Sequence, residues 1–188
     1  MPVPVARRGV VDGAGTRLPL EWVGTTEESV RIPASVKGIT MADANPTVRL
    51  STTHGDILIE LDRERTPESA ENFLGYVRSG HYDGTIFHRV IDGFMVQGGG
   101  FDRAMQQKPT GTPIKNEWES GVANTKGVLA MARLGNQPDS ATAQFFINVG
   151  DNTFLDEPRD GAGYAAFGRV VEGMDVVDEI RKVETHSV

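Results

Sequence analysis

The stretch "FHRVIDGFMVQGGG", residues 87–100, gathers side chains that could act on a ligand without bonding to it covalently. One arginine, Arg89, is followed closely by the ring of Phe94, the thioether of Met95 and the amide of Gln97. The stretch has no cysteine, no serine, no carboxylate pair and no cluster of metal ligands. It therefore indicates a fixed guanidinium beside an apolar surface, a combination that suits charge stabilisation without a nucleophile or a metal.

Arg89 by itself leaves two interpretations open. In an alternating strand, Phe87, Arg89 and Ile91 share one face, and His88 and Val90 share the other. An arginine beside two large apolar residues is costly unless it is exposed or paired. It is therefore either a rim arginine in a salt bridge or a guanidinium directed at a ligand carbonyl or amide, and its neighbours favour the second interpretation.

A second stretch, "ATAQFFINV", repeats the combination of an amide with aromatic rings. Alternation places Gln144 and Phe146 on one face of the expected strand and Phe145 on the other. The glycines at 98–100 allow a backbone or a ligand to approach closely. They do not form a phosphate loop, because no helix and no Lys-Ser/Thr pair follow them. The two stretches together predict a pocket that grips an apolar group beside a peptide bond.

Two alternative chemistries have weaker support. His88 could be a general base or a metal ligand, but the other three histidines stand at no ligand spacing, so we expect a structural role for it. Asp139, Ser140 and His81 could form a catalytic triad. Nothing around Ser140 resembles a nucleophile elbow, however, so we do not expect one.

Composition limits the class of protein. The chain has 188 residues, a formal net charge of −7 and a pI near 5.1, which suits one globular domain and argues against nucleic acid as a partner. No apolar run is long enough to cross a bilayer, so we expect no membrane association. The absence of cysteine agrees with a cytoplasmic location.

The elements that must position these side chains are mostly short strands. A hairpin is expected on either side of His54-Gly55, and a helix is expected from an N-cap at Thr66 to Gly80. A second amphipathic helix is expected at "MDVVDEIRKV". Between the helices lie five β-type runs: "TIFHRVI", "FMVQGG", "GVLAMAR", "AQFFINV" and "AAFGRVV". This order predicts a mainly β protein, a closed or nearly closed antiparallel barrel with a helix over each end.

Residues 1–45 lack this regularity and are interpreted as an N-terminal extension, with the domain at 46–188.

The motifs "FHRVIDGFMVQGGG", "GVLAMAR" and "SATAQFFINV", in this order, closely resemble cyclophilin-type peptidyl-prolyl cis-trans isomerases, most of all the short cytoplasmic bacterial branch. The similarity runs from about residue 48 to residue 183. It implies a closed eight-stranded antiparallel barrel capped by two helices, with an active groove on its outer face. It also implies rotation about Xaa-Pro bonds in peptides and in folding client proteins, by a monomer that uses no cofactor or metal.

The same resemblance assigns roles to residues that match the family's motifs. Arg89 matches the catalytic arginine, accompanied by Gln97 and Phe94 as further catalytic residues. The other matching positions bind substrate: Met95, Ala132, Arg133, Gln144, Phe146, Phe154, Leu155 and Tyr164. Arg133 departs from the family's usual asparagine. Phe154 stands where many eukaryotic members have tryptophan, which argues against tight cyclosporin binding.

Family members normally continue past the second helix with a strand that closes the barrel, and this strand is expected to be missing here. The β-like segment at 29–36 is a candidate to take its place, because barrel edges must be covered.

Two other classes of function stay open. The first is a proline-peptide binding module without turnover. The second is a small-molecule carrier, against which the bulky Phe145 and Ile147 argue because they would fill the interior.

Overall fold

A computed structural model describes residues 45–120, 122–158 and 160–185. Its strands form one antiparallel half-barrel in the order β1-β2-β7-β5-β6-β4-β3. The strands are β1 (Thr47–Thr52), β2 (Gly55–Leu61), β3 (Thr85–Ile91), β4 (Met95–Asp102), β5 (Val128–Met131), β6 (Phe145–Asn148) and β7 (Ala166–Glu172). The helices are α1 (Pro67–Arg78) and α2 (Met174–Ile180), with 3₁₀ turns η1 (Trp118–Ser120) and η2 (Thr153–Asp156). The expected hairpin, a strand in each of the five β-type runs and both expected helices are present.

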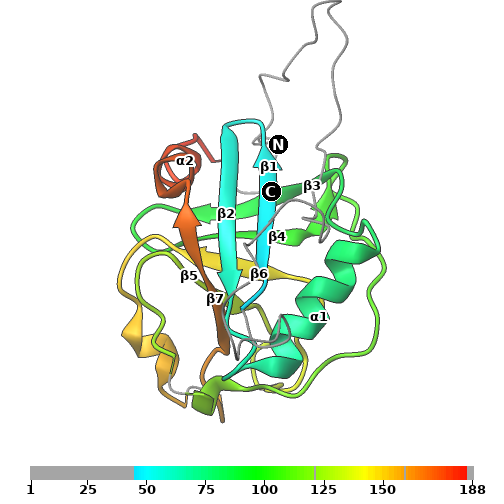
Figure 1. Cartoon of the computed structure of the whole chain (residues 1–188), viewed down its shortest axis with the longest axis vertical. Coiled ribbons are helices and arrows are strands. Elements are labelled where there is room, and N and C mark those ends of the chain that lie inside the picture. Colours follow the sequence, from blue (N-terminus) through cyan, green and yellow to red (C-terminus); the bar gives the residue numbers. More distant parts are fainter. Residues whose placement is uncertain (1–44, 121, 159, 186–188) are drawn as a thin grey trace, which may run out of the picture.

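The β1–β2 hairpin follows the alternation in the sequence. Ile57, Ile59 and Leu61 are fully buried in the main core, as their period-two spacing predicts. Figure 1 shows α1 and α2 on opposite sides of this hairpin. On the α1 side, the ring of Phe73 lies 5.3 Å from that of Phe167 on β7, which fixes the helix against the sheet.

The start of α1 is capped differently from the prediction. Thr66 occupies the N-cap position, but its side chain makes no capping bond and instead donates to the carbonyl of Asp62 at 2.8 Å. The carboxylate of Glu117 accepts from the backbone N–H groups of Glu68 at 3.1 Å and Ser69 at 2.8 Å. A carboxylate is the stronger acceptor and also complements the helix dipole, so a residue distant in sequence replaces the local cap.

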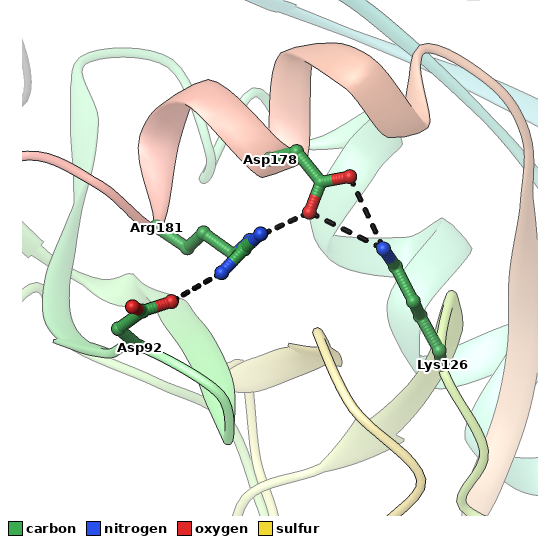
Figure 2. Close-up of polar contacts among 4 residues, drawn as sticks. All are labelled: Asp92, Lys126, Asp178 and Arg181. Carbon is green, nitrogen blue, oxygen red and sulfur yellow. Dashed lines mark hydrogen bonds and ion pairs between the residues drawn. The ribbon is translucent and has the colours of Figure 1, made fainter.

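Ion pairs around Arg181 attach helix α2 to the half-barrel (Figure 2). Arg181 lies between Asp92, in the β3–β4 turn, and Asp178, to which its Nε donates at 2.6 Å. Lys126, in the loop before β5, contacts the same carboxylate at 3.1 Å. The hydrogen bond from Arg181 lowers the pKa of Asp178 below its ordinary value. These pairs tie the C-terminal helix to two loops of the half-barrel.

Strands β1 and β3 are the two edges of the described sheet, so closure by an eighth strand stays a prediction. The extension expected at 1–45, apart from Asn45, and the candidate strand at 29–36 lie outside the described residues. Within the described part of the chain, no helix combines the length and apolar character that crossing a bilayer requires.

The buried side chains form two separate clusters. The larger fills the inside of the half-barrel and includes Phe145 and Ile147. These two side chains were expected to fill the interior, which argues against an internal cavity for a carried ligand. The smaller one contains Met95, Phe146 and Leu155, with Phe94 and Tyr164 packed against it. An apolar cluster separate from the main core is where a ligand could find an apolar surface.

Candidate active site

The site begins at a β-bulge in β3. Phe87 pairs with Gly98 and Arg89 pairs with Gln97, so two residues of β3 correspond to one step along β4. The extra residue reverses the alternation at this point. Phe87 and Val90 both pack against the main core, whereas Arg89 is exposed. The prediction that Phe87 shares a face with Arg89 is therefore wrong, because strict period-two spacing does not anticipate a bulge.

Arg89 lines an open cavity of about 540 Å³ on the outer side of the sheet. Every site residue predicted from the sequence except Gln144 also lines it, and Asp160 joins them without having been predicted. The other members of this wall are Phe94, Met95, Gln97, Ala132, Arg133, Phe146, Phe154, Leu155 and Tyr164. Residues from β3, β4, β6 and the loops after β5 and β6 thus converge on one hollow.

A string of polar side chains forms one half of the cavity. The Nη1 of Arg89 donates to Oε1 of Gln97 at 3.3 Å, and Nε2 of Gln97 donates to Oε1 of Gln144 at 3.0 Å. Gln144 therefore reaches the site through Gln97. Arg89 forms no ion pair with any described residue, so the structure does not support the rim salt bridge. Its charge stays available to a ligand.

Apolar side chains form the other half. Met95, Phe146 and Leu155 are buried and make the floor. The ring of Phe94 stacks on Phe154 at 5.7 Å, and Phe154 is 39% exposed at the rim. The result is a small apolar hollow directly beside a row of hydrogen-bonding groups.

Arg133 fixes the loop that precedes β7. Its guanidinium lies 4.5 Å from the ring centroid of Tyr164, a cation–π contact. It also donates to the carbonyls of Gly163 at 3.2 Å and Ala162 at 2.6 Å. The ring of Tyr164 in turn meets Phe146 edge-on at 5.8 Å. Arg133 thus stabilises one wall of the cavity.

The structure supports neither a catalytic triad at Ser140 nor a metal site at His88 among the described residues. The hydroxyl of Ser140 donates to the carbonyl of Gln137, and a ring nitrogen of His81 bonds to the carbonyl of Gly99, so these residues do not form a triad with Asp139. His88 is partly buried with its ring 4.6 Å from that of Phe101, and burial lowers its pKa. Among the described residues, no group of three or more His, Cys, Asp or Glu is placed to hold a metal ion.

Comparisons with known proteins agree with this geometry. The family model for cyclophilin type peptidyl-prolyl cis-trans isomerase/CLD matches residues 47–188. A peptidyl-prolyl cis-trans isomerase of Acinetobacter baylyi is 58% identical over 142 residues, which cover 76% of this chain and 75% of that protein. Peptidyl-prolyl cis-trans isomerase B of Escherichia coli is 57% identical over 141 residues, covering 73% and 85%.

A solved structure shares the fold. The cyclophilin type isomerase of Cryptosporidium parvum, determined in the presence of the dipeptide Ala-Pro, superimposes with a TM-score of 0.63 at 28% identity. The match covers 74% of this chain and 87% of that one. Family model, relatives and fold agree, and the chain belongs to the cyclophilin family of peptidyl-prolyl cis-trans isomerases.

Proposed function

We propose that this isomerase turns Xaa-Pro bonds in the cavity lined by Arg89, with the guanidinium as its catalytic group. Rotation breaks no covalent bond, which explains why the cavity needs no nucleophile. The uncatalysed barrier is on the order of 18–20 kcal/mol because amide resonance is lost in the twisted state. In that state the proline nitrogen becomes pyramidal, and its lone pair can accept a hydrogen bond from Arg89. This bond is stronger in the transition state than in either planar ground state, as catalysis requires.

The two halves of the cavity bind different parts of the substrate. The buried floor of Met95, Phe146 and Leu155 suits the apolar pyrrolidine ring. We assign the amides of Gln97, which lines the cavity, and of Gln144, which accepts a hydrogen bond from Gln97, to holding a flanking carbonyl while the bond turns. The single observation that carries the proposal is that Arg89 is exposed, borders this apolar floor, is aligned by Gln97 and forms no ion pair with a described residue.

The test is Arg89→Ala assayed on a Xaa-Pro peptide. We expect kcat/KM to fall by roughly tenfold or more, equivalent to about 1.4 kcal/mol or above. Arg89→Lys should recover little, because lysine lacks the rigid, planar array of donors. Arg49→Ala is the matched control, since Arg49 is an arginine on β1 that is paired with Asp56 and does not line the cavity. Unchanged turnover in Arg89→Ala would refute the assigned role.

We also propose that the substrates are proline-containing peptides and folding client proteins, handled by a single chain. The openness of the cavity supports the first point, because an extended peptide can lie across it. Sedimentation of the active protein, with and without an unfolded proline-containing client, tests both points.

We propose further that an eighth strand lies between β1 and β3 and closes the barrel. Support comes from the gap between these edges, which is lined by apolar side chains that an uncovered edge would expose to water. These include Leu50, Tyr82, Ile86, Phe87 and Phe145. Slow amide exchange along the outer edges of both β1 and β3 would support closure, and rapid exchange along both would contradict it.

A further inference from the structure

Three buried asparagines lie behind the apolar half of the cavity. Asn124 and Asn148 are fully buried, and Asn152 is 5% exposed. A buried amide is costly unless its hydrogen bonds are made, so a group of three calls for a physical reason. None of the three lines the cavity, and none was singled out from the sequence.

The three amides form a directed string of hydrogen bonds. Asn152 donates through Nδ2 to Oδ1 of Asn148 at 2.8 Å, and Asn148 donates through Nδ2 to Oδ1 of Asn124 at 3.1 Å. The second bond donated by each amide goes to the protein around it. These partners are the carbonyls of Phe94 at 2.8 Å, Val128 at 3.0 Å and Tyr164 at 3.0 Å. A string in which each amide donates two hydrogen bonds is rigid.

The ends of this string are bonded to two different residues that line the cavity, Phe94 and Tyr164. At one end, Asn152 holds the carbonyl of Phe94. At the other, Asn124 holds the carbonyl of Tyr164 and is itself fixed by the carboxylate of Asp156 at 2.7 Å.

The backbone reinforces both attachments. The N–H of Asn152 donates to the carbonyl of Asn124, and the carbonyl of Asn152 accepts from Leu155, each at 2.8 Å. The carbonyl of Leu155 then accepts from the N–H of Tyr164 at 2.9 Å. The floor residue Leu155 is thus connected to the same string.

We propose that Asn124, Asn148 and Asn152 are positioning residues that set the width of the proline pocket and so its selectivity for the five-membered ring. The inference rests on the assignment of the apolar half as the proline site. The string holds Phe94, Leu155 and Tyr164 through their backbones, so it acts on the apolar walls. Its amides donate no hydrogen bond to Arg89, Gln97 or Gln144, which are aligned by their own hydrogen bonds. Loosening the string therefore weakens ring binding and leaves the catalytic half in place.

The test compares Asn152→Ala with Val177→Ala, a truncation in the main core away from the cavity. For each variant, NMR line-shape analysis of a Xaa-Pro peptide separates KM from kcat. A second peptide series replaces proline with six-membered pipecolate. For Asn152→Ala we expect KM to rise about three- to tenfold with kcat within about twofold, and the preference for proline over pipecolate to fall at least about threefold. For Val177→Ala we expect lower thermal stability with unchanged KM and ring preference.

Unchanged KM and ring preference in folded Asn152→Ala would overturn the inference, as would a loss confined to kcat. If Asn152→Ala does not fold, Asn152→Leu keeps the branched shape and similar volume, removes both donated bonds and adds no buried charge, and the same readouts apply to it. Arg89→Ala assayed in parallel separates the two ideas. Its failure to lower turnover would contradict the catalytic assignment, whereas an unaltered ring preference in the Asn152 variants contradicts only the positioning role.

Discussion

A substitution at Gly100 offers a way to displace the side-chain amide of Gln144, which we propose to act in turnover, without mutating Gln144 itself. A Cβ added at Gly100 would lie 2.5–2.6 Å from Nε2, Cδ and Cγ of Gln144. The backbone of Gly100 is outside the left-handed region, so alanine is tolerated there without strain. Gly100→Ala must therefore act by displacing the Gln144 side chain, which breaks its hydrogen bond with Gln97.

The size of the effect follows from that bond. A neutral side-chain hydrogen bond contributes about 0.5–1.5 kcal/mol, which corresponds to a loss of about 2- to 13-fold in kcat/KM if the amide acts in the transition state. The stability should change little, because Gln144 can turn toward the open cavity side of the sheet.

The assay is a protease-coupled or NMR exchange measurement of kcat/KM on Gly100→Ala, Gln144→Ala and the double variant. If both changes remove the same interaction, the double variant is no worse than Gln144→Ala alone. Gly75→Ala is the control, because a Cβ at Gly75 in α1 meets nothing within 4 Å. It should stabilise the helix by about 0.5–1 kcal/mol and leave activity unchanged.

Two results would refute the reasoning. Wild-type activity in Gly100→Ala would mean that the position of Gln144 does not matter to turnover. Losses that add up in the double variant would mean that Gly100→Ala acts through something other than Gln144.

Two further predictions concern stability. Burial lowers the pKa of His81 below 6.5, so on acidification the unfolded chain takes up this proton before the folded protein does. We therefore expect the contribution of His81 to stability to fall as the pH drops below about 6.5, so that urea titrations at several pH values give a shallower pH slope for His81→Gln than for the parent chain. Glu117→Ala should cost about 1–2 kcal/mol in urea unfolding, because α1 loses its cap. Glu119→Ala, at an exposed neighbour, should cost under about 0.5 kcal/mol. A Glu117→Ala loss no larger than that of Glu119→Ala would contradict the capping role.

Local patterns in the sequence were sufficient for the elements of the fold. The alternation of Ile57, Ile59 and Leu61 predicts the buried face of β2, and the spacing of Phe73, Leu74 and Val77 predicts the buried face of α1. Such patterns succeed because the core demands apolar side chains at the period of each element. The same sequence motifs placed Arg89, Gln97 and Phe146 in one site, and the structure brings them together.

Tertiary structure decided what depends on contacts between distant segments. The bulge that separates Arg89 from Phe87 reflects how β3 pairs with β4, and no local pattern announces it. The cap from Glu117 to α1 joins residues 48 positions apart. Asparagines in loops and at strand ends are common, and nothing in the sequence distinguishes Asn124, Asn148 and Asn152 from the others. The hydrogen-bonded string that they form could therefore not be predicted. Hydrogen-bond partners are chosen by three-dimensional proximity, and for buried polar groups that proximity exists only once the chain has folded.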